Sequence, residues 1–148
     1  MGAGKAGRED DPAPPTWMRE RPMRVMLDSS FLIDQLRGDR AAIDRFGALF
    51  ADGDEPLVNL VAVCEVEAGL RPAEERAFAA ILAASEFTQA CPEAARDAGR
   101  WRRAALRRGG ALSLGDALIA AEAHHMGAAV LTRNVRDFAL TPVRVLTY

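Results

Sequence analysis

Met23-Arg-Val-Met-Leu-Asp28-Ser-Ser is an apolar run that ends abruptly in a carboxylate. Residues 24–27 predict a short buried strand, and Ser30 is a candidate cap for a helix through Leu36. A lone buried carboxylate costs roughly several kcal/mol unless it is paired, protonated or bound to a metal ion. The other role open to Asp28 is a helix cap, worth about 1 kcal/mol. Because Ser30 can already cap that helix, we expect Asp28 to belong to a site.

Two more carboxylates interrupt apolar sequence in the same way. Glu65 lies within Val61-Ala-Val-Cys-Glu-Val66, and Asp116 opens Leu114-Gly-Asp-Ala-Leu-Ile-Ala-Ala. Three such placements in one small chain suggest that the carboxylates converge. Converging carboxylate oxygens are typical ligands of Mg²⁺ or Mn²⁺, and such sites are typical of phosphodiester chemistry.

Each of these two residues also has an ordinary structural interpretation. Helical spacing places Glu65 on the face of its helix that should pack inward, where an arginine from residues 100–108 could neutralise it. Asp116 stands three residues after Ser113, in a pattern similar to a capping box, where an acid stabilises the first helical turn. A capping carboxylate can also turn toward a site, so the two roles of Asp116 are compatible.

Short apolar runs alternate with helical patterns along the rest of the chain. The expected strands cover residues 24–27, 56–58, 128–131 and 143–146. The expected helices cover residues 30–36, 40–50, 60–68 with Asn59 as the cap, 73–84, 93–108 and 113–126. Strands separated by helices predict an α/β fold with a mostly parallel sheet covered by helices.

The predicted topology brings polar residues to one edge of that sheet. In parallel sheets, sites form beyond the carboxyl ends of the strands. Asp28 follows the first strand, the helix of Glu65 follows the second, and Asn134 follows a later one. Thr132 and Asp137 accompany Asn134, and for Asp137 we favour a helix cap before Phe138 over a ligand role.

Length and composition indicate one globular domain. The chain has 148 residues, of which 49% are hydrophobic and 27% charged, and no apolar stretch reaches the roughly 18 residues that a membrane span needs. Residues 1–22 are rich in glycine, proline and charge, so we expect a disordered extension before a domain at 23–148, with Met23 as a candidate natural start. We expect Cys64 and Cys91 to be buried reduced thiols, in keeping with the cytoplasm.

Charge is distributed unevenly along the chain. Residues 24–92 hold 6 Lys and Arg against 12 Asp and Glu, whereas residues 93–148 hold 9 against 5. An acidic focus beside a basic face suits a metal-dependent enzyme acting on a polyanion, although solvated helix charge gives the same pattern.

Trp101 is interpreted as a core anchor rather than a stacking residue, and the adjacent His124 and His125 do not suit a shared metal. The candidate phosphate contacts are Arg100, Arg102, Arg103, Arg107 and Arg108.

Four segments together make the chain resemble the PIN-domain proteins, and specifically the VapC-type toxins of toxin–antitoxin pairs. They occur in the order and at the separations usual in that family, between Met23 and the C terminus. The segments are Val25-Met-Leu-Asp28-Ser-Ser-Phe-Leu-Ile-Asp, Asn59-Leu-Val-Ala-Val-Cys-Glu65-Val-Glu-Ala-Gly-Leu, Leu114-Gly-Asp116-Ala-Leu-Ile-Ala-Ala and Leu131-Thr-Arg-Asn134-Val-Arg-Asp-Phe.

The resemblance implies a three-layer α/β/α fold around the parallel sheet and an Mg²⁺- or Mn²⁺-dependent endoribonuclease. By the family pattern, Asp28 and Asp116 are the direct metal ligands, and Glu65 holds or activates the water at the metal. Asn134 occupies the fourth position, which is often Asp, and this weakens the expectation of a second tightly bound ion. Supporting roles are assigned to Ser29, Thr132 and Asp137.

The resemblance also implies partners. Family members are commonly homodimers that a small VapB-type antitoxin neutralises, and their targets are RNAs, with tRNA, rRNA and mRNA all open here. Two alternatives keep the fold: an RNA-processing or DNA-directed nuclease without an antitoxin, and a degenerate module that binds without cutting. The retained acids Asp28, Glu65 and Asp116 argue against the second alternative.

Overall fold

Five parallel strands form one sheet in the computed structural model, which describes residues 22–148. The strand order is β3-β2-β1-β4-β5, and every neighbouring pair is parallel. The strands are β1 (Arg24–Leu27), β2 (Glu55–Val58), β3 (Glu86–Phe87), β4 (Ala129–Leu131) and β5 (Val145–Leu146). The predicted parallel sheet is therefore confirmed, with β3 as a strand that the sequence did not reveal. The predicted disordered extension lies outside the described residues except for Pro22.

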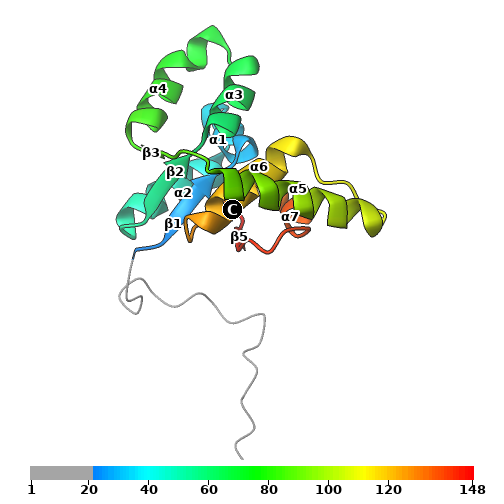
Figure 1. Cartoon of the computed structure of the whole chain (residues 1–148). Coiled ribbons are helices and arrows are strands. Elements are labelled where there is room, and N and C mark those ends of the chain that lie inside the picture. Colours follow the sequence, from blue (N-terminus) through cyan, green and yellow to red (C-terminus); the bar gives the residue numbers. More distant parts are fainter. Residues whose placement is uncertain (1–21) are drawn as a thin grey trace, which may run out of the picture.

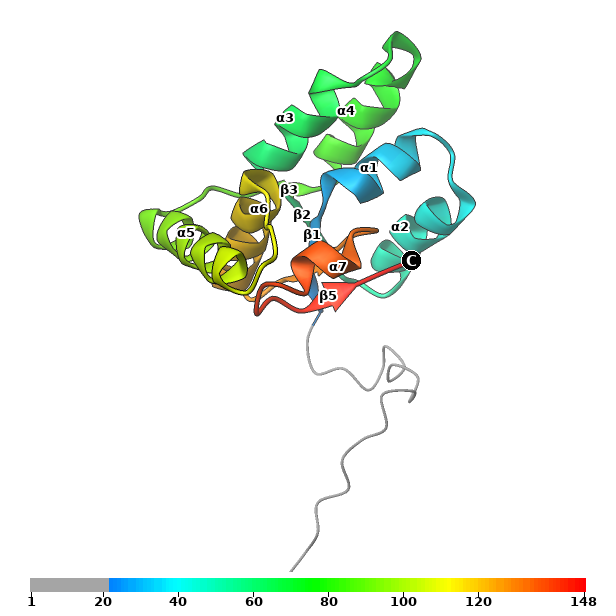
Figure 2. The same cartoon turned by 90° about the vertical axis from the view of Figure 1, so that its right-hand side faces the viewer.

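Helices cover both faces of this sheet. Figure 2 shows α5 and α6 on one side of the strands and α1 and α2 on the other, so the three-layer α/β/α prediction is confirmed. α3 and α4 extend together beyond the sheet (Figure 1). The helices are α1 (Ser29–Leu36), α2 (Arg40–Ala51), α3 (Leu60–Ala68), α4 (Glu75–Ala83), α5 (Pro92–Arg107), α6 (Leu114–His125) and α7 (Val135–Phe138).

The caps of the helices agree only partly with the predicted ones. Asn59 caps α3 and Ser113 caps α6, as predicted. The cap of α1 is Asp28 and not Ser30, because the Asp28 side chain accepts the Ser30 N–H. Asp137 lies inside α7 and does not cap it, so that prediction is wrong. Asp28 therefore has the capping role in addition to any role in a site.

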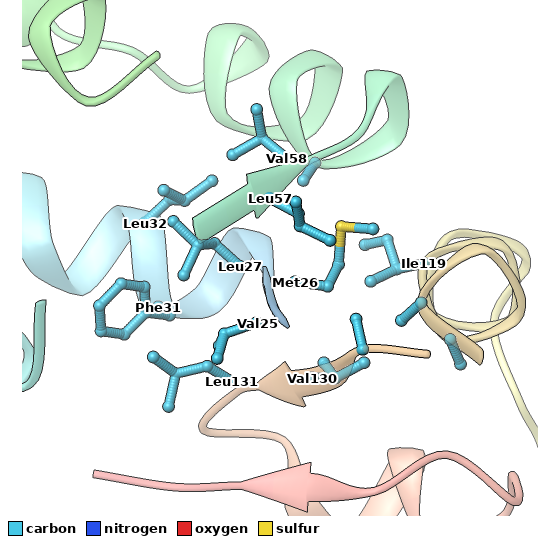
Figure 3. Packing of buried hydrophobic residues seen from close by; sticks show 14 of the residues in the cluster. Val25, Met26, Leu27, Phe31, Leu32, Leu57, Val58, Ile119, Val130 and Leu131 are labelled. Atoms are coloured by element: carbon cyan, nitrogen blue, oxygen red, sulfur yellow. The ribbon is translucent and has the colours of Figure 1, made fainter. Parts of the chain in front are cut away.

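The core fills the space between the sheet and its helices. Met26 points toward Ile119 of α6, whereas Leu27 and Leu131 lie toward Phe31 of α1 (Figure 3). Side chains alternate across a strand, so Val25, Met26 and Leu27 of β1 contribute to both layers of the core and are buried, whereas Arg24 at the start of the strand is only half-buried. This explains why the three residues before Asp28 are all apolar.

Two side-chain predictions have different outcomes. Trp101 is half-buried, packs against the core and meets His124 edge-on at a ring-centroid distance of 5.7 Å, which confirms its anchoring role. Cys64 and Cys91 are free thiols, but Cys64 is exposed and Cys91 half-buried, so the prediction of burial is wrong. Cys64 lies on the outer side of α3, away from the buried Ala62 and Val66.

No helix within residues 22–148 is long and apolar enough to cross a membrane.

Candidate active site

Asp28 is fully buried at the carboxyl end of β1, and its two carboxylate oxygens have different surroundings. Oδ2 accepts hydrogen bonds from the Ser30 hydroxyl at 2.6 Å, from the Thr132 hydroxyl at 2.8 Å and from the Ser30 N–H at 3.3 Å. Oδ1 is equally buried and has no hydrogen-bond partner among the described residues. A buried ionised oxygen without a partner is unfavourable unless a cation completes its shell.

Thr132 and Ser30 connect this carboxylate to the end of β4. The Thr132 hydroxyl accepts the Asn134 N–H at 2.9 Å, and the Ser30 hydroxyl accepts the Arg133 N–H at 3.1 Å. The Asp28 N–H also donates to the Leu131 carbonyl at 3.1 Å. These bonds hold the ends of β1 and β4 in one orientation, so the position of Oδ1 is set by two strands.

Glu65 comes to the same edge from α3. Its carboxyl group has a raised pKa, mainly through partial burial and then through the charge of Asp28, while a hydrogen bond with Ser29 acts in the opposite direction. The carboxyl group is partly desolvated but the residue as a whole is exposed, so the prediction that Glu65 lies on the inward face of its helix is wrong. The inward face is that of Ala62 and Val66, and Glu65 lies beside it at the rim of the site.

Asp116 enters from the first turn of α6. Its N–H donates to the Ser113 hydroxyl at 3.1 Å, which confirms the predicted cap. Its pKa is raised to about 6, mainly by burial and then by the charges of Asp28, Asp137 and Glu65. Because charges raise a pKa in this way only at short range, the structure brings these four carboxylates into one electrostatic cluster.

Asn134 and Asp137 belong to the segment that follows β4, Asn134 directly before α7 and Asp137 within it. Asn134 is exposed directly before α7, and its side chain makes no capping bond within the described part of the chain. Asp137 is half-buried in α7 and close enough to raise the pKa of Asp116. Asp137 therefore acts on the carboxylate cluster through its charge, which the capping prediction did not include.

Sequence reasoning missed a buried polar network behind the cluster. Glu122 of α6 is only 3% exposed and accepts hydrogen bonds from the Thr88 hydroxyl and from the Asn59 side chain at 3.0 Å. Asn59 also caps α3 through its Oδ1, which accepts the Ala62 N–H at 3.0 Å. This network ties α3, the helix of Glu65, to α6, the helix of Asp116. The sequence did hold one indication of this network, because Glu122 stands among the alanines of α6.

The predicted phosphate contacts divide into two groups on α5. Arg100, Arg103 and Arg107 are exposed and recur at helical spacing, and Arg96 extends the same row by one turn. Arg102 instead donates to the Leu112 carbonyl at 3.1 Å, which ties α5 to the segment before α6. Arg108 lies at the helix end and lines a cavity of about 450 Å³ with Trp101 and Leu140.

The donor set suits a hard divalent cation that keeps most of its waters. Within residues 22–148, no three carboxylate, histidine or cysteine side chains stand close enough to form a complete metal site by themselves. Mg²⁺ typically takes only one or two protein carboxylates directly. Oδ1 of Asp28, which has no hydrogen-bond partner among residues 22–148, and the negative charge around Asp116 would suit such an ion.

Sequence comparison identifies the family of this chain. Residues 25–142 match the family model of the PIN domain. Ribonuclease VapC19 of Mycobacterium tuberculosis is 32% identical over 117 residues, which are 79% of this chain and 94% of that protein. Ribonuclease VapC10 of the same organism is 36% identical over 117 residues, which are 78% of this chain and 86% of that protein. The chain belongs to the PIN-domain family, in which it groups with VapC-type ribonucleases.

Solved structures share the fold over nearly their whole length. VapBC2 from Rickettsia felis, bound to a DNA fragment of its promoter, superposes with a TM-score of 0.73 at 18% identity, covering 85% of this chain and 99% of that one. A toxin–antitoxin complex from Klebsiella pneumoniae superposes with a TM-score of 0.67 at 29% identity, covering 83% of this chain and 96% of that one.

Proposed function

We propose that this protein is a divalent-metal-dependent endoribonuclease and the toxin of a type II toxin–antitoxin pair. The observation that carries the proposal is the buried Asp28 carboxylate, whose Oδ1 lacks a partner among the described residues while three more acids lie close by. The kinship with VapC-type ribonucleases supports RNA as the substrate. It does not select among tRNA, rRNA and mRNA.

Asp28 and Asp116 are the proposed ligands of the ion, which we take to be Mg²⁺ or Mn²⁺. When bound, such an ion lowers the pKa of water and offsets the charge that develops on the phosphate. Glu65 takes the proton from water as the new bond to phosphorus forms and the bond to the ribose oxygen breaks in line, and the leaving ribose oxygen takes a proton from solvent. Ser29 orients Glu65 and favours its ionised form. Thr132 holds Asp28 through a hydrogen bond, the Asn134 N–H donates to Thr132, and the charge of Asp137 acts on Asp116.

The exposed arginines of α5 are the proposed contacts for the RNA backbone. Arg100, Arg103 and Arg107 face solvent, and Arg108 extends the basic surface at the helix end. Arg102 has its Nε occupied by the Leu112 carbonyl, so we give it a smaller part than the sequence suggested. Guanidinium groups suit phosphate because their fork of donors can bind two oxygens at once.

A VapB-type antitoxin is the proposed protein partner. The related structures from Rickettsia felis and Klebsiella pneumoniae are complexes of toxin with antitoxin, which supports this choice. We further propose that the protein acts in the cytoplasm as a homodimer and that residues 23–148 form its PIN domain. A short overlapping reading frame beside the gene would support the toxin over a nuclease without an antitoxin.

The decisive experiment is cleavage of total RNA by the purified, partner-free protein with Mg²⁺, with Mn²⁺ or with EDTA. The variant Asp28→Asn keeps a cap acceptor for α1 but loses the negative charge, and Asp44→Asn removes an exposed carboxylate of α2 as a matched control. We expect discrete metal-dependent fragments from the wild type and from Asp44→Asn, and none from Asp28→Asn.

Two outcomes would change the proposal. Cleavage that persists in EDTA would rule out the metal dependence, and cleavage that persists in Asp28→Asn would rule out the proposed site. Metal-dependent cleavage of single-stranded DNA in preference to RNA would point to the DNA-directed alternative, and binding of RNA without any cleavage would point to the degenerate module.

A further inference from the structure

Gly115, the second residue of α6, lies directly against the carboxylate of Glu65. A Cβ atom at this position would stand 3.2 Å from Oε1, 3.4 Å from Cδ and 3.5 Å from Oε2 of that side chain. All three nearest atoms belong to the Glu65 carboxylate, and the shortest distance is closer than an ordinary non-bonded contact. A side chain at position 115 would therefore require the Glu65 carboxylate to move by a few tenths of an ångström.

The backbone does not explain a glycine at this position. The described glycines with a positive φ are Gly38, Gly53, Gly109 and Gly127, and Gly115 is not among them. A glycine inside a helix is less favourable than alanine, because it gives up more backbone freedom on folding. Gly47 in α2 shows the contrast, since a Cβ there would meet no described atom within 4 Å. The close approach of the Glu65 carboxylate is thus the feature that separates Gly115 from Gly47.

We propose that Gly115 is a positioning residue, whose missing side chain lets the Glu65 carboxylate lie against the first turn of α6 beside Asp116. α3 and α6 each bring one of these acids, so their distance depends on how closely Glu65 can approach α6. The charge of Glu65 is also among the causes that raise the pKa of Asp116, which agrees with this closeness. The catalytic meaning of the arrangement rests on the proposed function, whereas the contact itself does not.

The test compares Gly115→Ala with Gly47→Ala. Both changes favour the helix, so both variants should have a melting temperature at or above that of the wild type. Gly115→Ala should displace the Glu65 carboxylate and lower kcat about tenfold, while KM for RNA stays nearly constant. Gly47→Ala should leave kcat unchanged. A more stable protein that is less active would distinguish positioning from a structural role.

A double-mutant cycle assigns the loss to Glu65. Asp is one methylene shorter than Glu, so in a Glu65→Asp background the carboxylate is withdrawn from α6. Gly115→Ala should then change kcat by less than about twofold. An additive tenfold loss in that background would mean that Gly115 acts on something other than Glu65, and it would overturn the proposal.

A stability measurement tests the contact without any activity. In a Glu65→Ala background the new methyl group meets no carboxylate, so Gly115→Ala should raise the melting temperature by more than it does in the wild type. Equal gains in the two backgrounds, or wild-type kcat in Gly115→Ala, would contradict the inference. If the wild type cleaves no RNA, the proposed function fails, but this difference in melting temperature still decides whether the contact exists.

Discussion

Asp28 combines two demands that conflict in the absence of a metal ion. Its Oδ2 holds α1 and β4 together through three hydrogen bonds, whereas its Oδ1 is buried without a partner among residues 22–148. A protein selected for stability alone would gain from an amide or an apolar side chain at this position. The burial of this carboxylate therefore supports the proposal that the folded protein binds a cation at Asp28.

Asp28→Asn should separate stability from metal binding. Without metal, we expect the free energy of unfolding of the variant to equal that of the wild type or to exceed it by up to about 1 kcal/mol, because a buried charge is removed. With Mn²⁺ at 100 times its Kd, the wild type should gain about 2.7 kcal/mol and the variant almost nothing. Differential scanning calorimetry with and without Mn²⁺ measures both effects. A full Mn²⁺ response in Asp28→Asn would exclude Asp28 as a ligand.

Asp116 should make the stability of the metal-free protein depend on pH. Its pKa of about 6 in the folded state lies above the ordinary value of 3.8, so the folded state binds the proton more tightly. The stabilising contribution is complete below about pH 4 and is lost as the pH rises through about 6. Asp116 is partly exposed, so solvent screening reduces the effect at pH 7 to the order of 1 kcal/mol.

Asp116→Asn tests this prediction, because it removes the titrating group. In EDTA the variant should be more stable than the wild type at pH 7 and about equal to it at pH 4. Urea unfolding across that range measures the difference. If the difference in free energy of unfolding between the variant and the wild type did not shrink toward pH 4, Asp116 would not titrate in this way.

At the scale of elements, α5 presents a row of basic side chains to solvent. Arg96, Arg103 and Arg107 have no acidic partner within the described residues, and Arg100 pairs with Asp97 at 2.6 Å. Their spacing of four, three and four residues places them on one face of the helix. The row is exposed, and α5 packs on α6, the helix that carries Asp116.

Replacing Arg96, Arg103 and Arg107 together by Gln should weaken RNA binding and its dependence on salt. The slope of log K against log salt should become shallower by about 2, since each phosphate contact to a single strand contributes roughly 0.7. Arg76→Gln on α4 is the matched control and should leave the slope unchanged. Binding titrations at several salt concentrations give the slopes, and an unaltered slope in the triple variant would place the RNA elsewhere.

The connection of α3 to α6 depends on one buried carboxylate. Glu122→Ala should destabilise the protein by about 3 kcal/mol, because the Asn59 amide and the Thr88 hydroxyl lose their partner. Glu122→Gln keeps an acceptor and a donor at that place and should cost less than about 1 kcal/mol. Urea unfolding of both variants measures this, and equal losses for Ala and Gln would mean that the charge itself is required.

Most elements could be predicted because their signals are local. Apolar runs marked β1, β2 and β4, and the caps Asn59 and Ser113 marked the starts of α3 and α6. β3 has two residues, both exposed, so it has no apolar pattern and exists only through its pairing with β2. α7 is a single turn of four residues, too short for helical periodicity to appear in the sequence.

The candidate site could be predicted in outline for a different reason. Parallel strands align their carboxyl ends, so the positions of Asp28 and Asn134 after β1 and β4 followed from topology alone. The exposure of Glu65 and the contact with Gly115 could not be predicted, because they depend on how closely α3 approaches α6. Such tertiary distances leave no periodic trace in the sequence.

On the scale of the whole molecule, the candidate site lies where two halves of the chain with opposite charge balance meet. Asp28 and Glu65 come from residues 24–92, which carry 12 acidic against 6 basic residues, and Asp116 comes from residues 93–148, which carry 5 against 9. A metal ion would neutralise the acidic centre, and the basic helix would attract the RNA backbone around it. The domain boundary at residue 23 and the homodimer stay predictions.

The most direct test of this account is the anomalous diffraction of a crystal soaked in Mn²⁺. We predict a peak about 2.0–2.3 Å from Oδ1 of Asp28, a direct coordination distance for such an ion, with Asp116 on its other side. The absence of this peak at Mn²⁺ concentrations that support RNA cleavage, or a peak at a different carboxylate, would contradict the account.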